Sequence, residues 1–129
     1  AALAAPAAPP RVAVAMAGQP SPPRPPRVLC LHGKGHTGEA FRQNIKALED
    51  LGQLELVSPD AAHPLGGGFA WWLLPPGERS FTTPRFDGWS GTLAHVQRLW
   101  SEQGPFDAVL GFSQGAILLA ALAAIGALP

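Results

Sequence analysis

Short apolar runs alternate with stretches of helical periodicity from residue 27 to residue 124. The runs predict buried β-strands, because each is four or five residues long and is bounded by turn-forming residues. The expected strands are 28–31, 54–57 and 106–110. The expected helices are one through Phe41, Ile45 and Leu48 that ends at Gly52, one from Trp89 to Gly104-Pro105, and one over 116–124 that is apolar on all sides. This order predicts an α/β fold, a three-layer sandwich with a mostly parallel sheet and right-handed crossovers.

The segment 61–87 shows no convincing periodicity. Irregular stretches of this length inside a compact domain are usually functional lids or disordered loops. Trp71 and Trp72 lie within the segment, which indicates that it packs onto another part of the protein. Each tryptophan is expected either in a pocket wall or in the core.

The first 26 residues differ in composition from the rest. Eight of the 15 prolines fall there among alanines, and the first acidic residue is Glu39. We therefore expect a disordered leader over 1–26 and one domain over 27–129. A transit peptide is an alternative for the leader, although the prolines disfavour an amphipathic helix. A further alternative is that translation starts at Met16, since the first residue is Ala1.

The charge and the cysteine content limit which partners, bonds and metal sites the sequence predicts. The 9 basic and 9 acidic residues cancel, so the sequence predicts neither a nucleic acid nor an anionic membrane as partner. Cys30 is the single cysteine, which excludes an internal disulfide and a four-thiolate zinc site. It also favours a reducing compartment, hence the cytoplasm, with the nucleus open as well. No metal and no cofactor is expected.

The strongest chemical motif is Gly111-Phe-Ser113-Gln-Gly115, which follows a predicted strand and precedes a predicted helix. That context matches the nucleophile elbow, in which a strained turn exposes a serine hydroxyl. Ser113 is therefore the predicted nucleophile. The backbone N–H of Gln114 lies at the start of the helix and is expected to stabilise an oxyanion.

A second loop lies directly after the first predicted strand. His32-Gly33 there is typical of an oxyanion loop, and Lys34 would offer the second backbone N–H. An alternative exists, because Gly33, Gly35 and Gly38 also form the dinucleotide fingerprint G-x-G-x-x-G. That alternative leaves the serine motif unexplained.

The chain resembles the FSH family of serine hydrolases. The matching stretches are RVLCLHG (27–33), DAAHP (60–64), Trp71-Trp72 and GPFDAVLGFSQGA (104–116). The resemblance covers 27–125, about the first half of such a domain. It implies a small α/β-hydrolase, here truncated, that acts as a carboxylesterase on small-molecule esters. It also implies that His32, Gly33, His36, His63, Trp71 and Trp72 belong to the substrate-binding region.

The resemblance implies a Ser-Asp-His triad, of which only Ser113 can be placed. Residues 114–129 contain no Asp, Glu or His, although both partners follow the serine in this fold. We therefore expect the chain by itself to be inactive, with a non-catalytic binding or scaffold role as the alternative. Membrane anchoring is a lesser alternative, because the 22 residues 108–129 carry no charge.

Overall fold

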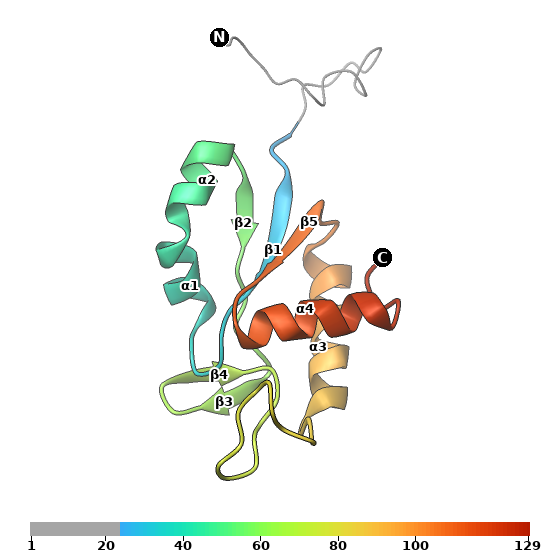
Figure 1. Cartoon of the computed structure of the whole chain (residues 1–129). Helices are drawn as coiled ribbons and strands as arrows, with labels where there is room; N and C mark the ends of the chain where they lie inside the picture. The colour runs from blue at the N-terminus through green and yellow to red at the C-terminus, as the bar shows by residue number, and fades with distance from the viewer. Residues whose placement is uncertain (1–23) are drawn as a thin grey trace.

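The protein is described here by a computed structural model, which covers residues 24–129. Most of the predicted leader thus lies outside the described residues. Strands and helices alternate along the rest of the chain (Figure 1). In chain order they are β1 (Arg27–Leu31), α1 (Gly38–Asn44), α2 (Lys46–Gly52), β2 (Glu55–Val57), β3 (His63–Leu65), β4 (Gly68–Ala70), α3 (Trp89–Gln103), β5 (Ala108–Gly111) and α4 (Gln114–Ala124).

The main sheet has the order β2-β1-β5, and both pairings are parallel. The central strand β1 places Leu29 opposite Val57 of β2 and opposite Val109 of β5. All three strands arise from the predicted apolar runs, within two residues at each end. The α/β class and the mostly parallel sheet are therefore confirmed.

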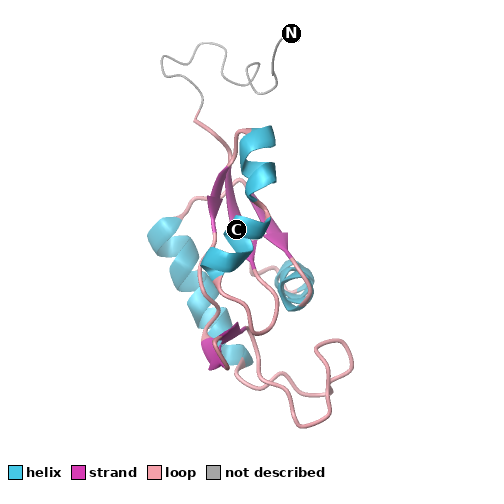
Figure 2. Cartoon of the chain, turned by 90° about the vertical axis from the view of Figure 1, so that its left-hand side faces the viewer, coloured by secondary structure: helices cyan, strands magenta, loops and turns pink. Residues whose placement is uncertain are grey.

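Side chains of β1 alternate between two apolar clusters, one on each face of the sheet. Val28 and Cys30 pack with Phe41 of α1 and Leu56 of β2. Leu29 and Leu31 belong to the other cluster, which α3 and α4 complete with Val96, Leu118 and Leu122. Because successive side chains of a strand point to opposite faces, a continuous apolar run is what a doubly covered strand requires. Figure 2 shows helices on both sides of the strands.

The single helix predicted through Phe41 and Leu48 is wrong. Two short helices meet at Ile45, which closes α1 and precedes α2 with non-helical dihedral angles (φ −110°, ψ 16°). Phe41 is buried, but Leu48 is 44% exposed and Leu51 is 85% exposed. The apolar spacing thus does not mark a continuous buried face, because no residue of α2 is buried.

The irregular segment contains a hairpin that no periodicity in the sequence predicts. β3 and β4 pair antiparallel across a glycine-rich turn, in which Gly66 has φ 60°. The hairpin is hydrogen-bonded to the loop after β1, since the Gly35 N–H donates to the Phe69 carbonyl and the Phe69 N–H donates to the His36 carbonyl, both at 2.8 Å. The remainder, 71–88, forms the yellow-brown loop below the hairpin in Figure 1.

Helix α4 buries one face and leaves the rest partly open. Leu118 and Leu122 are fully buried, whereas Ile125 just beyond the helix is 58% exposed. The helix is therefore apolar over a wider part of its surface than the stripe that is buried. Among the described residues, no helix combines the length and the apolar character that crossing a bilayer would require.

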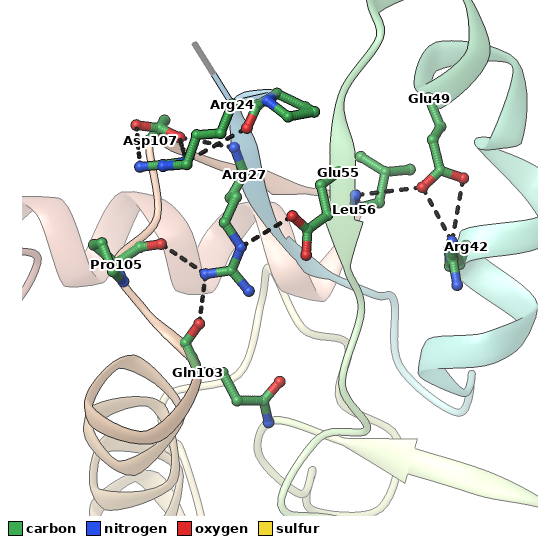
Figure 3. Close-up of polar contacts among 10 residues, drawn as sticks. Arg24, Arg27, Arg42, Glu49, Glu55, Leu56, Gln103, Pro105 and Asp107 are labelled. Atoms are coloured by element: carbon green, nitrogen blue, oxygen red, sulfur yellow. Dashed lines mark hydrogen bonds and ion pairs between the residues drawn. The ribbon is translucent and has the colours of Figure 1, made fainter. Parts of the chain in front are cut away.

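Arg27 joins the start of β1 to its neighbours (Figure 3). Its guanidinium donates to the carbonyls of Gln103 (2.6 Å) and Pro105 (2.9 Å) and pairs with Glu55 at 3.3 Å. The Arg27 backbone N–H donates to the Asp107 carboxylate at 2.7 Å. This hydrogen bond is the main reason why the pKa of Asp107 lies below its usual value. The network aligns β2, β1 and the entry to β5 at one end of the sheet.

Cys30 is expected to be chemically inert in the folded protein. It is fully buried, and burial, with the nearby Glu49 carboxylate, raises the pKa of its thiol to about 11. Only the thiolate reacts, so iodoacetamide at pH 8 should label the native chain at least ~100-fold more slowly than the chain in 8 M urea. Mass spectrometry over time gives both rates. Equal rates in the two conditions would contradict the burial of Cys30.

Candidate functional site

Ser113 lies at the sharp turn between β5 and α4. Its dihedral angles are φ 57° and ψ −117°, a combination that residues other than glycine rarely adopt. Holding a serine there costs roughly 1–3 kcal/mol, which the surrounding packing must offset. Ser113 is the N-cap residue of α4, yet its side chain accepts no hydrogen bond from a backbone N–H of the helix. Ser113 is exposed, and its hydroxyl has no hydrogen-bond partner within residues 24–129.

Two glycines allow β5, the turn and α4 to approach one another. A Cβ atom at Gly111 would collide with the carbonyl of Gly115, and one at Gly115 would collide with the carbonyl of Leu31 on β1. All the atoms met are backbone, which cannot rotate away. The glycine spacing in the motif thus has a direct steric cause.

A pocket of about 290 Å³ opens beside Ser113. Three segments contribute to it: the loop after β1, the turn before α4, and the irregular segment 71–88. Its lining residues are Gly33, Lys34, His36, Arg79, Ser80, Phe81, Phe112 and Ser113.

Two backbone donors next to the pocket lack a protein acceptor. Within residues 24–129, neither the N–H of Lys34 nor that of Gln114 donates to any other group. The N–H of Gln114 lies in the first turn of α4, where unpaired donors and the helix dipole favour negative charge. These are the two N–H groups that the sequence assigns to an oxyanion.

His32 is buried beneath the loop rather than in the pocket. Its Nε2 accepts from the Ala61 N–H at 3.0 Å, so its Nδ1 carries the proton and donates to the Gly33 carbonyl at 2.7 Å. Burial lowers the pKa of His32 below its usual value, which keeps the ring neutral. His32 therefore holds the loop in shape, and it does not belong to the pocket lining.

The Gln114 side chain connects the serine turn to the irregular segment. It is fully buried, its Oε1 accepts from the Trp71 N–H at 2.7 Å, and its Nε2 donates to the Trp72 carbonyl at 3.0 Å and to Ser80 Oγ at 3.3 Å. The Thr92 hydroxyl donates to the Trp71 carbonyl from α3. The sequence motif predicts only the backbone role of Gln114, because its side-chain role depends on contacts 34–43 residues away.

Both tryptophans belong to the core. Trp71 and Trp72 are fully buried, and the Nε1 of Trp71 donates to the His32 carbonyl at 2.8 Å. Neither lines the pocket, so of the two expected placements the structure gives the core for both. His63 also lies elsewhere, with Nε2 2.9 Å from the Gly88 carbonyl at the start of α3.

Of the predicted site residues, the structure thus brings together Gly33, Lys34, His36 and Ser113, with the Gln114 backbone adjacent. Sequence reasoning missed four lining residues: Arg79, Ser80, Phe81 and Phe112. Phe112 lies inside the serine motif, next to Ser113, so its place beside the site could have been predicted from the motif. The other three lie in the long irregular segment, whose length indicated a functional role without naming residues.

The dinucleotide alternative is disfavoured at the start of α1. A pyrophosphate would need the free N–H groups of this helix end, but the Asp60 carboxylate accepts from the Gly38 N–H at 2.8 Å. The Thr37 hydroxyl accepts from the Ala40 N–H at 3.1 Å.

Across residues 24–129, no group of three or more His, Cys, Asp or Glu side chains is arranged to hold a metal ion.

A parallel α/β sheet with a serine at a strained strand-to-helix turn, beside a pocket, defines a protein of the serine hydrolase class. Residues 20–127 match the family described as "Serine hydrolase (FSH1)", and the chain belongs to this family.

Similar proteins carry esterase names. The chain is 33% identical over 105 residues to Esterase C25G4.2 of Caenorhabditis elegans, covering 72% of this chain and 48% of the worm protein. It is 34% identical over 128 residues to human Esterase OVCA2, covering 80% and 56%. It is also 31% identical over 128 residues to Rhodanese-like domain-containing protein 6 of Arabidopsis thaliana, covering 74% and 22%. The chain thus spans about half the length of the two esterases.

Proposed function

We propose that this chain carries the nucleophile of a carboxylesterase, with Ser113 attacking small-molecule esters. The observation that supports this best is the position of Ser113, a free hydroxyl on a strained turn beside a pocket with two unpaired N–H donors. The family and the esterase names of its relatives support the hydrolase class.

The proposed reaction follows the acyl-enzyme route. Ser113 Oγ attacks the ester carbonyl carbon while its proton passes to a general base. The carbonyl oxygen becomes an oxyanion, which the N–H groups of Gln114 and Lys34 stabilise. The alcohol leaves with the proton from the base, and water then releases the acid and frees Ser113. No cofactor takes part in this scheme.

The general base and its orienting acid are the open part of the proposal. His36 is the one histidine in the pocket lining, and we assign it to the pocket wall. We propose instead that a histidine and an aspartate outside these 129 residues complete the site. This chain by itself is then expected to be inactive toward p-nitrophenyl acetate.

A non-catalytic binding role is the second candidate. It is favoured by the composition of the pocket, whose lining includes no Asp or Glu that could orient a base. In that case Ser113 would keep its turn without an activated hydroxyl.

A fluorophosphonate probe separates these candidates, because it labels only an activated serine. The native protein from its source should be labelled on Ser113, and Ser113→Ala should abolish the label. The same sample gives the intact mass. Labelling together with a mass well above 13.4 kDa would support the hydrolase and a longer polypeptide. An unlabelled protein near 13.4 kDa would favour the binding role.

Esterase assays on the 129-residue chain test the location of the base. We expect no hydrolysis of p-nitrophenyl acetate above the level of Ser113→Ala. Hydrolysis that disappears in Ser113→Ala would show that the chain contains its own base, and His36→Gln would then be the next variant to measure.

A further inference from the structure

Positive charge gathers around Ser113. Lys34 and Arg79 both line the pocket, on opposite segments: the loop after β1 and the irregular segment before α3. The lining contains no carboxylate. The acid next to Arg79 in the chain, Glu78, accepts from the Thr82 hydroxyl at 3.3 Å and lies outside the lining.

These two cations differ from the others in lacking a partner. Eight of the nine lysines and arginines lie in residues 24–129, and five of them form ion pairs. Arg98 is hydrogen-bonded to His95 at 3.0 Å. Within the described residues, Lys34 and Arg79 have neither an ion pair nor a side-chain hydrogen bond. Of the eight lysines and arginines in this part of the protein, the two without a side-chain partner therefore both lie at the pocket.

The backbone of Arg79 is held in place. Its N–H donates to Thr82 Oγ1 at 3.1 Å, and its carbonyl accepts from the N–H groups of Thr82 (3.0 Å) and Thr83 (2.9 Å). The next residue, Ser80, accepts a hydrogen bond at its Oγ from Gln114 Nε2 at 3.3 Å. Arg79 thus starts from a fixed position next to the serine turn, and only its long side chain remains free to meet a ligand.

The lining also contains two phenylalanines. Phe81 is 74% exposed and Phe112 is 60% exposed, although both border the pocket. Aromatic faces in water next to two free cations suit a ligand that has an apolar body and an anionic group. A neutral ester would use the aromatic rings but would leave both charges unsatisfied.

We propose that this pocket selects esters that carry an anionic group, such as a carboxylate, within reach of Arg79 and Lys34. The inference deepens the proposed function and rests on it, since it takes the pocket beside Ser113 to be the ester site. The anion can belong to the acyl part or to the alcohol part of the ester. Arg79 and Lys34 are then specificity-determining residues, with Lys34 contributing its side chain in addition to its backbone.

Binding of uncleaved amide analogues tests this directly, because it does not require a general base. Glutaric acid monoanilide carries the carboxylate on the acyl side, and 4-butyramidobenzoate carries it on the other side. Valeranilide and butyranilide are their neutral counterparts. Calorimetric titration of the 129-residue chain should show at least one acid binding about tenfold more tightly than its counterpart, as expected for charge-assisted hydrogen bonds. The acid that is preferred identifies the side.

Variants then assign the preference to the two cations. Arg79→Gln and Lys34→Gln should each reduce it, whereas Arg98→Gln, on α3 and outside the lining, should leave it unchanged. Raising sodium chloride from 50 mM to 500 mM should lower the affinity for the acid and leave the affinity for the neutral analogue unchanged, because salt screens exposed charges. Equal affinity for acids and neutral analogues, or a preference that survives both pocket variants, would overturn the inference.

These outcomes are independent of the labelling test. Selective binding of an acid by a protein whose Ser113 is never labelled would support the anion site and contradict the proposed esterase activity. Labelling of Ser113 in a protein without anion preference would support the esterase activity and contradict the anion site.

Discussion

Replacing Gln114 with leucine is expected to lower the free energy of unfolding by about 3 kcal/mol, because three hydrogen bonds are lost and buried partners stay unpaired. The affected partners are the Trp71 N–H, the Trp72 carbonyl and the Ser80 hydroxyl. Leucine fills a similar volume, so the loss is mainly polar. Urea unfolding followed by tryptophan fluorescence measures the change.

Gln97→Leu is the matched control. Gln97 is exposed on α3, so the same substitution there should change the free energy of unfolding by at most about 0.5 kcal/mol. If the two variants unfolded at the same urea concentration, the Gln114 amide would not hold the irregular segment. Gln114→Leu should also weaken the anion preference of the pocket, because Ser80 and Arg79 are adjacent.

Adding one methyl group at Gly115 is expected to be equally damaging. In Gly115→Ala the new Cβ would collide with the Leu31 carbonyl and come close to the His32 carbonyl, so α4 must shift away from β1. Overpacking against atoms that cannot rotate should cost about 3 kcal/mol of unfolding free energy. The shift would also displace Ser113, two residues away, so fluorophosphonate labelling of the native protein should disappear with it.

Gly67→Ala provides the same substitution in open space. Nothing lies within 4 Å of a Cβ atom at Gly67, and its φ is not in the left-handed region. We expect its urea midpoint and labelling to match those of the unmodified protein. A Gly115→Ala protein that was as stable as Gly67→Ala would mean that α4 and β1 are farther apart than described here.

These two predictions concern the same structural unit. The serine turn is connected to β1 through the close approach at Gly115 and to the irregular segment through the Gln114 amide. The strain at Ser113 persists because both connections hold the turn in place. The geometry of the proposed nucleophile therefore depends on residues that do no chemistry themselves.

Local patterns were sufficient for much of the fold. The three strands of the main sheet and the helices α3 and α4 follow from apolar runs and spacing, because a doubly covered strand such as β1 and an amphipathic helix such as α3 need those patterns. The patterns failed at Ile45 and in the hairpin β3–β4. In both places short elements are determined by contacts with distant segments, such as the hydrogen bonds between Phe69 and the loop after β1.

The sequence by itself determined the α/β class, the serine at a strand-to-helix turn, and the loop after β1 that faces it. These features depend on residue types at fixed short spacings, so they are readable without coordinates. The tertiary structure alone decided which residues surround Ser113. It placed Arg79 and Phe81 in the pocket and the two tryptophans in the core, with His32 beneath the loop. The physical reason is that burial and hydrogen bonding across 29–43 residues of chain assign these side chains, and no local pattern encodes those distances.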